Sequence, residues 1–532
     1  MLPRYITAVV TKLLAWGLTA RAPIASAQVA PFISGFPGCD AIITAGLGHR
    51  LVFATDLEYT VRTETYWAQN SRLRPFCFFL PHNTEEVAAG LVALLYNVGN
   101  YTKGAGNWHI AVRSAGHNMG HSNNIEYGVT IDLFYLRDTS YDPATNLAMI
   151  GPGNRWQDVY PILFKHGVLV AGGRDGSVGV GGYLIGGGSS YHQAEYGFGC
   201  DTVKNFEVVL VNGTIVNANE THHRGLWQAL RGGGSNFGIV TRFDMEAIPN
   251  KKLAYGQRFI FANASRQFVD ATVDFVNNQE VYKDTALIAT VAHVAGEDLI
   301  TTTEVNTNTI LSSPAFAQFR TLPQKAPFIE FPVELKVIAP LGQLPPGSWA
   351  FINTITFLNN RDMLNFAIEA HRKATEDLEV EIGVGGFVST LIFQPVPAYF
   401  ANLSEQRGGN MFSDLFRLGN GVICTTELMV QYVGDNELKY KIASRRFHQL
   451  EAALMNYALE IGAYHPYIDL NYGDSVQDPL GSYPVENVRH IRRISNLYDP
   501  QRKFQDRVFP GFKIDRVVAN GYHVDYTMKD EL

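Results

Sequence analysis

Hydrophobic positions between residues 71 and 248 fall into short runs separated by turn residues. The runs HIAVRS, VTIDLF, LAMIGPG, VKNFEVVLVNG and FGIVTRFDM predict strands, and Val211–Thr214 is a hairpin turn signal. One helix is predicted after the turn at Pro81–Glu86, because acidic residues occupy its first turn. Strands and helices do not alternate evenly, so the pattern favours an α+β fold over a repeated βαβ arrangement.

A different mixture of patterns follows from residue 249 to 463, where we expect a second domain. Strand-like runs (QRFIFA, TALIATVAHV, SWAFINTITFL) stand beside two stretches with apolar residues at helical spacing, Asp362–Asp377 and Glu437–Ile461. Residues 28–70 are expected to form a small cap. Residues 464–515 are again rich in Asn, Tyr, Pro and Gly. The sequence therefore predicts two domains followed by a C-terminal segment.

Composition excludes several classes of protein. A chain with 46% hydrophobic and 17% charged residues is folded rather than disordered. The formal net charge is −7 and no long basic run occurs, which argues against nucleic-acid binding. The 49 glycines allow close approach of backbone to a ligand, and the 12% aromatic content suits flat pockets. Together these features hint at a large planar ligand.

Both ends of the chain carry signals for the secretory route. Residues 1–27 are expected to be a signal peptide, with Arg4 before an apolar stretch and small residues at Ala25–Ala27. The apolar stretch is shorter than the roughly 20 residues that span a bilayer, so no membrane span is expected. Residues 529–532 read KDEL, an address that makes the KDEL receptor a candidate partner. We expect the endoplasmic reticulum lumen, with secretion as the alternative.

Cysteines and glycosylation sequons agree with that route. Cys39 and Cys77 lie early in segments rich in turn residues, and they are predicted to form a disulfide in an oxidising compartment. Cys200 and Cys424 lie in apolar surroundings and are expected to be buried free thiols. Five sequons predict N-glycosylation at Asn100, Asn212, Asn219, Asn263 and Asn402.

The densest chemical signal lies in residues 171–200. Eleven of these thirty residues are glycine, where 49 glycines in 532 residues would give about three. Bare N–H groups and positions with positive φ can surround a pyrophosphate or another polyanion, although a set of tight turns is the structural alternative. The sequence contains neither a complete G-x-G-x-x-G nor a G-x-x-x-x-G-K-[ST] motif. This argues against a nicotinamide dehydrogenase of the Rossmann type and against a P-loop.

A second polar loop, Ala111–Gly120, follows a predicted strand. Arg113, the Ser114 hydroxyl and exposed amides could hold phosphate groups, with His117 at the mouth of the loop. An ordinary hydrogen-bonded surface histidine is the alternative. His117 and His121 are four residues apart, but the glycines disfavour a helix and no third ligand is evident. No metal site is therefore predicted.

Taken together, these motifs resemble the FAD-linked oxidoreductases of the vanillyl-alcohol-oxidase (PCMH) type, most closely the berberine-bridge-enzyme-like oxidases of plants and fungi. Arg113–His117 resembles their R-S-x-G-H loop, and Ser177–Tyr183 with Gly186–Gly188 resembles their T-V-G-V-G-G-H…G-G-G run. Leu230–Thr241 and Asn471–Tyr472 continue the resemblance in the same order.

The resemblance implies a two-domain PCMH-type fold. Residues 71–248 would form the FAD-binding domain, and residues 249–463 would form a substrate domain with an antiparallel sheet and covering helices. Residues 464–515 would be a berberine-bridge-like segment that returns to the FAD domain.

The resemblance also implies FAD as the cofactor, with one covalent link through His117. Arg113–Gly116 would bind the pyrophosphate, and the backbone at Gly181, Gly182 and Ile239 would lie close to the flavin. The other cofactor-binding residues expected on this basis are Ser114, Ala115, Asn118, Val178, Tyr183 and Asn471.

Three positions depart from the family pattern. Asp175 stands where many members carry a cysteine that forms a second flavin link, so only one covalent bond is expected. Tyr183 replaces the usual histidine but keeps a donor that could reach the ribityl chain. Ser189 stands where plant members place a tyrosine base, and a serine is too weak a base to act alone.

The reaction that the resemblance implies is hydride removal from a C–H bond by the flavin. Tyr472 is the preferred candidate base, because the returning segment closes the flavin pocket in the family; a packed core tyrosine is the structural alternative. Glu427 and Tyr191 are weaker candidates. Val178 favours O2 as the acceptor, because a small residue at its position leaves room for oxygen in the family.

The expected substrate is a small aromatic or polycyclic natural-product intermediate, changed by alcohol oxidation, desaturation or oxidative ring closure. The many Phe and Tyr residues of the second domain fit such a substrate, although core packing explains them too. A carbohydrate oxidase of the same family and a non-catalytic secreted flavoglycoprotein are the alternatives. Asp175 counts against the carbohydrate oxidases, which usually carry the second flavin link.

Overall fold

The computed structural model describes residues 33–96, 108–120, 123–341, 345–430 and 436–518. The predicted signal peptide, the KDEL sequence, His121 and the sequon at Asn100 lie outside these residues. Within the described ranges, none of the helices is both long and apolar enough to cross a membrane.

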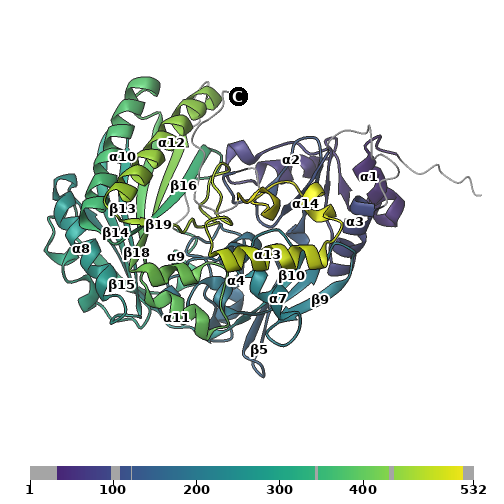
Figure 1. The fold of residues 1–532 in the computed structure, drawn as a ribbon, viewed down its shortest axis with the longest axis horizontal. Coiled ribbons are helices and arrows are strands. Elements are labelled where there is room, and N and C mark those ends of the chain that lie inside the picture. The colour runs from purple at the N-terminus through teal and green to yellow at the C-terminus, as the bar shows by residue number, and fades with distance from the viewer. Residues whose placement is uncertain (1–32, 97–107, 121–122, 342–344, 431–435, 519–532) are drawn as a thin grey trace, which may run out of the picture.

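Two sheets form the N-terminal half of the molecule, on the right in Figure 1. The first sheet has the order β1-β2-β4-β3, with parallel pairing among its last three strands. The second has the order β5-β6-β10-β8-β9 and is antiparallel. The strands of these two sheets are β1 (Leu51–Val52), β2 (Cys77–Phe79), β3 (Ile110–Arg113), β4 (Val129–Asp132), β5 (Thr139–Asp142), β6 (Leu147–Ile150), β8 (Val203–Val209), β9 (Ile215–Asn219) and β10 (Ile239–Glu246).

An eight-stranded antiparallel sheet dominates the other half, in the order β15-β12-β14-β13-β17-β18-β16-β19. Its outer face is covered by three helices (Figure 1). The strands are β12 (Leu253–Ile260), β13 (Thr285–Val294), β14 (Glu297–Asn306), β15 (Ile329–Val333), β16 (Trp349–Leu358), β17 (Phe387–Val396), β18 (Gly421–Val430) and β19 (Tyr464–His465), and the covering helices are α8 (Ser265–Asn278), α10 (Arg361–Ile382) and α12 (Asn436–Glu460).

Alternation along the sheet strands assigns side chains to two environments. In β13, Leu287 and Ala289 are buried in the cluster beneath the helices, whereas Ile288 faces the opposite side. Since successive side chains of a strand point to opposite faces, one apolar pattern serves both the core and the inner surface of the sheet. The inner surface faces the N-terminal half.

Shorter helices and a small two-stranded sheet fill the rest of the structure. The α+β class predicted from the pattern is confirmed. These remaining elements are α1 (Pro37–Ile42), α2 (Leu57–Glu64), α3 (Thr84–Tyr96), α4 (Trp156–Phe164), α5 (Val180–Gly186), α6 (Gln193–Tyr196), α7 (Arg224–Leu230), α9 (Leu335–Ile338), α11 (Tyr399–Gln406), α13 (Val485–Tyr498) and α14 (Lys503–Arg507), with β7 (Val168–Leu169) paired to β11 (Ile248–Pro249).

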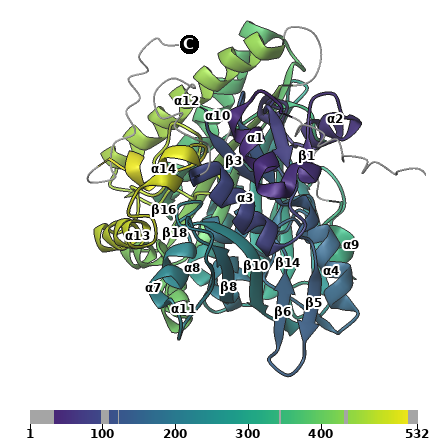
Figure 2. The same ribbon diagram turned by 90° about the vertical axis from the view of Figure 1, so that its right-hand side faces the viewer.

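The C-terminal segment lies against both halves of the molecule. Its strand β19 pairs with β16 of the large sheet, and its helices α13 and α14 contact α7 and α3 (Figure 2). The Asn236 side chain donates to the carbonyl of Phe512 (2.9 Å), and the Lys513 ammonium donates to the carbonyl of Ser235 (2.7 Å). These bonds fasten the end of the described chain to the loop before β10.

Cys39 and Cys77 form a disulfide that joins α1 to β2, and Cys200 and Cys424 are buried thiols, as predicted. Residues 33–70 are more than a cap, because β1 is a strand of the first sheet. Among the described sequons, Asn212, Asn263 and Asn402 are exposed and Asn219 is half-buried. Glycosylation and location in the cell stay predictions.

A buried ion pair connects the two halves. Asp201 and Arg231 are fully buried with 3.2 Å between Oδ1 and Nη2, and the same Oδ1 accepts hydrogen bonds from Ser404 and Asn410. Removing one partner of such a pair leaves the other charge buried, at a cost of about 3–5 kcal/mol. We therefore expect Asp201→Ala to lower the thermal midpoint by roughly 5–10 °C in scanning calorimetry. Glu486→Ala, which breaks an exposed pair with Arg489, should leave the midpoint unchanged.

Candidate active site

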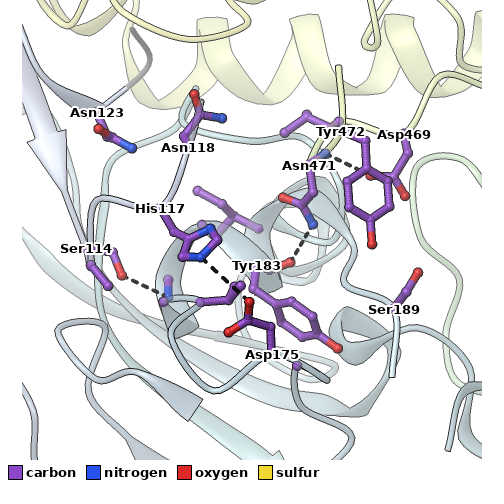
Figure 3. A pocket seen from close by; sticks show the side chains of 18 of the residues that line it. Ser114, His117, Asn118, Asn123, Asp175, Tyr183, Ser189, Asp469, Asn471 and Tyr472 are labelled. Atoms are coloured by element: carbon purple, nitrogen blue, oxygen red, sulfur yellow. Dashed lines mark hydrogen bonds and ion pairs between the residues drawn. The ribbon is translucent and has the colours of Figure 1, made fainter. Parts of the chain in front are cut away.

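A cavity of about 490 Å³ lies between the inner face of the large sheet and the N-terminal half (Figure 3). The cavity is lined by the loop after β3, the glycine-rich segment, the turn before Tyr472 and side chains of six strands of the large sheet. Fourteen of the fifteen residues that the sequence assigned to cofactor or catalysis line it, and Arg113 is the exception. Eleven of the fourteen carry side chains and three are glycines: Ser114, Ala115, His117, Asn118, Val178, Tyr183, Tyr191, Ile239, Glu427, Asn471 and Tyr472, with Gly116, Gly181 and Gly182.

The loop that carries His117 is held rigidly at its base. The Ser114 hydroxyl donates to the carbonyl of Pro152 and accepts from the Gly181 N–H (3.2 Å). Gly116 has φ +73°, and a Cβ there would lie 2.9 Å from Nε of Arg113. Only glycine therefore fits this turn without strain. The turn places His117 on the cavity wall.

His117 is packed and hydrogen-bonded in a defined orientation. Its ring stacks on Trp67 with 5.1 Å between centroids, and Nε2 lies 2.8 Å from Oγ of Ser177. Asp175 accepts hydrogen bonds from Ser177 and lies 4.0 Å from His117 Nε2 (Figure 3). Burial lowers the pKa of His117 to about 4, although Asp175 opposes this shift. The imidazole is therefore neutral and nucleophilic at neutral pH.

Arg113 corrects one sequence prediction. Its side chain is buried away from the large cavity, 3.2 Å from Asp132 Oδ2, and it donates to the carbonyl of Arg62 and the hydroxyl of Thr65. The guanidinium also lies over the ring of Tyr66. Arg113 therefore braces the loop from behind, and its side chain does not line the large cavity. An arginine at the end of a strand can point to either side, and the sequence alone did not reveal which.

The glycine-rich segment lies against the loop at van der Waals distance. A Cβ at Gly179 would lie 2.7 Å from the Cβ of Ala115, and a Cβ at Gly186 would lie 2.2 Å from Oδ1 of Asn471. The segment contains helix α5, which the sequence pattern did not predict. Tyr183 lines the cavity, but its hydroxyl donates to the carbonyl of Ala171 (3.4 Å), so the donor expected to reach a ribityl chain is directed elsewhere. Its own carbonyl accepts from Asn471 (3.1 Å) (Figure 3).

The three candidate catalytic side chains share the cavity, but burial favours the protonated form of each. Burial raises the pKa of Tyr472, although Arg174 opposes this, and burial also raises the pKa of Tyr191. Burial raises the pKa of Glu427, which accepts a hydrogen bond from Thr390 (3.3 Å). Neither tyrosine is thus ionised at neutral pH in the resting protein.

Sequence reasoning missed three residues of this site. Arg174 Nη2 donates to the Tyr472 hydroxyl (2.9 Å) and to Oε1 of Gln394 (2.5 Å). Asp469 accepts from the N–H of Asn471 (2.8 Å), and burial raises its pKa to about 6. Arg174 directly precedes Asp175, and Asp469 stands two residues before Asn471, so nearness to marked positions was the only available signal. Gln394 comes from β17 and had none.

Comparison with known proteins decides the family. Residues 75–219 match the family described as an FAD binding domain. The FAD-dependent monooxygenase sdcF of Emericella nidulans is 33% identical over 485 residues, which covers 90% of this chain and 98% of the relative. This chain belongs to the FAD-linked oxidoreductases.

Solved structures show the same fold for this oxidoreductase. The xylooligosaccharide oxidase of Myceliophthora thermophila, solved with xylobiose, superposes with a TM-score of 0.70 at 17% identity and covers 89% of this chain and 99% of its own. The berberine bridge enzyme of Eschscholzia californica gives 0.67 at 14% identity and covers the same shares. The two-domain PCMH-type, berberine-bridge-like fold is thereby confirmed.

The residues on the wall of the cavity fit FAD. Oδ1 of Asn118 and Oδ1 of Asn123 are buried and have no hydrogen-bond partner in the described part of the chain, and both side chains line the cavity (Figure 3). Gly179, Gly181 and Gly182 form a glycine cradle on the same wall: an added Cβ would meet the loop or Pro152 at Gly179 and Gly181, and open space at Gly182. Unpaired buried polar atoms are costly, so the oxidoreductase has acceptors set aside for a large polar ligand.

Proposed function

We propose that this protein oxidises a C–H bond of a small aromatic or polycyclic natural-product intermediate, with FAD bound covalently to His117 and O2 as the acceptor. The observation that carries the proposal is the placing of neutral His117 and the Tyr472–Arg174 pair on the wall of one cavity. Bound FAD would supply the acceptor for a hydride and pass the electron pair to O2.

The chain's own residues account for the attachment. Ser177 fixes the imidazole of His117 through Nε2, and Trp67 covers one face of the ring. The low pKa of His117 keeps one ring nitrogen unprotonated. An unprotonated, oriented imidazole is the form in which histidine acts as a nucleophile. Asp175 offers no sulfur, so His117 is proposed as the single tether.

The sheet side of the cavity supports an apolar substrate. Ile288, Ile352 and Ile392 come from three different strands and face the same space, together with the ring of Tyr255. Pockets that take flat apolar ligands use such walls and a few placed polar groups. Polar side chains are also present, among them Arg174, Tyr472, Gln394, Gln257, Thr303 and Glu427, but most of the exposed cavity surface is apolar. This supports an aromatic or polycyclic natural-product substrate over a carbohydrate substrate.

Tyr472 is the candidate that we place at the reacting atoms. Of the three candidates, it is the one hydrogen-bonded to a cation, and the turn that carries it is fixed by Asp469. Its hydroxyl is protonated and can donate to an oxygen of the substrate, which orients the C–H bond. Exchange of that proton during the reaction is eased by the adjacent guanidinium.

A screen of phenolic, alcoholic and carbohydrate substrates with peroxide detection tests the proposal. One peroxide released for each product formed is the expected result, and oxidation of carbohydrates alone would contradict it. Relatives of this chain are named FAD-dependent monooxygenases, which favours a second candidate reaction, monooxygenation of the substrate. Incorporation of labelled oxygen from O2 into the product, without peroxide, would favour that candidate.

Val178 provides a separate test of oxygen use. The side chain is half-buried on the cavity wall, so a larger residue there narrows the space for O2. We expect Val178→Leu to slow oxygen consumption by roughly 10-fold, because overpacking costs about 1–2 kcal/mol. Anaerobic oxidation of substrate should keep its wild-type rate. Unchanged oxygen consumption, measured with an oxygen electrode, would show that Val178 does not limit access.

A further inference from the structure

Arg174, half-buried on the cavity wall, has no carboxylate partner among the described residues, in contrast to three fully buried arginines. Arg113, Arg231 and Arg258 lie 3.2, 3.2 and 2.8 Å from a carboxylate oxygen. In the described part of the chain, no carboxylate oxygen lies within 4.0 Å of the Arg174 guanidinium nitrogens. Proteins seldom leave a sheltered cation without an anion, because its lost hydration is then uncompensated.

The carboxylates near Arg174 are engaged or shifted toward neutrality. Asp175 is turned toward Ser177, whose N–H and hydroxyl each donate to Oδ1 at 2.7 Å. Glu427 and Asp469 line the same cavity, but their oxygens lie more than 4.0 Å from the Arg174 nitrogens, and burial raises the pKa of both, that of Asp469 to about 6. The positive charge of Arg174 is therefore incompletely balanced by the protein.

The guanidinium also has donors to spare. Nη2 serves Gln394 and Tyr472, both neutral acceptors, whereas Nε and Nη1 have no acceptor among the described residues. Neither of these two nitrogens is fully buried, and Arg174 lines the cavity. Arg174 thus brings to the cavity wall charged donors that have no acceptor in the described chain, and such donors can bind an oxyanion.

The walls around these donors are apolar or aromatic. Ile352, Ile392 and the ring of Tyr191 line the cavity with Arg174. A low local dielectric strengthens an ion pair and makes the unpaired cation more costly. A neutral substrate would leave that cost in place, and an anionic substrate would remove it.

We infer that the substrate binds as an oxyanion conjugated to an aromatic ring system, a phenolate, enolate or carboxylate, paired with Arg174 and held by a second hydrogen bond from Tyr472. An ionised substrate also explains why neither tyrosine candidate needs to be a resting base. The inference rests on the proposed function in one respect, which is that the bound anion is taken to be the substrate. Binding of an anion itself requires no turnover.

The test compares two ligands of the same shape, 2-naphthoate and 2-naphthamide, on the holoenzyme. Dissociation constants come from the change in flavin absorbance on titration. We expect the wild type to bind the carboxylate roughly 30-fold more tightly than the amide, and Arg174→Met to remove that preference. Arg174→Lys should keep part of it. Arg266→Met, the same change at an exposed arginine of α8, should match the wild type.

Three results would overturn the inference: no preference in the wild type, a preference that survives in Arg174→Met, or a change in the flavin midpoint potential of that variant with the preference intact. The last result would show that Arg174 serves the flavin instead. A native flavin spectrum in each variant excludes misfolding, and Arg174→Lys carries the test if the methionine variant does not fold. A protein that prefers the carboxylate but oxidises no compound would refute the proposed function and leave this inference standing.

Discussion

Replacement of His117 by alanine should leave the polypeptide without covalently bound flavin. The wild type should stay yellow after acid precipitation, and its fragment containing residue 117 should carry the added mass of FAD. In His117→Ala both signals should vanish, because no other side chain of the loop offers an unprotonated ring nitrogen at this point of the cavity wall. The Asn118 amide and the glycine cradle remain, so some FAD should still bind reversibly.

The same variant should oxidise its substrate more slowly. Loss of the tether is expected to lower the flavin midpoint potential by about 60 mV, which makes a two-electron reduction about 100-fold less favourable. Spectroscopic redox titration measures the shift. His222→Ala, at an exposed histidine, is the matched control and should keep both the attached flavin and its potential. Flavin mass retained on His117→Ala would place the tether at another residue.

Tyr472→Phe should lower the rate of flavin reduction by about 100-fold, as found when one donor to a developing oxyanion is removed. The change deletes one hydroxyl and keeps the ring, so packing of the turn should be preserved. Asp469 and Asn471 still fix the backbone, and the FAD content should equal that of the wild type. Anaerobic stopped-flow bleaching of the flavin, with the substrate found by screening, provides the measurement.

Two results separate a chemical role for Tyr472 from a packing role. Tyr457→Phe makes the same change on α12, where the ring stacks on Phe366, and should reduce flavin at the wild-type rate. If Tyr472→Phe also reduces flavin at that rate, the hydroxyl does not contact the reacting atoms. A variant that loses FAD or stability instead would assign Tyr472 to the core.

Local patterns predicted the elements and one wall of the site. The runs at HIAVRS and VTIDLF became β3 and β4, and the helical spacings at Asp362–Asp377 and Glu437–Ile461 became α10 and α12 with a few more residues. Glycine density marked the cradle correctly, because close packing against Ala115 tolerates no side chain at Gly179. These features depend on neighbours in sequence or on a residue's own size.

The direction of side chains and their contacts with residues distant in the chain could not be predicted from the sequence. Arg113 belongs to the motif yet turns to Asp132, whereas Arg174, which had no predicted role within the glycine-rich segment, reaches Tyr472 almost 300 residues later. The pairing follows from the fold of the C-terminal segment back onto the N-terminal half, which no local spacing encodes. The pKa of His117 likewise depends on burial by Trp67 and its surroundings.

The bonds between Asn236 and Phe512, and between Lys513 and Ser235, have a consequence for biosynthesis. A chain emerging from the ribosome presents the His117 loop long before Asn471 and Tyr472 exist. The wall that they complete can form only when translation is almost finished. Cofactor capture and the proposed bond formation at His117 therefore belong to the finished polypeptide, and nascent chains stalled before residue 464 should remain colourless apoprotein.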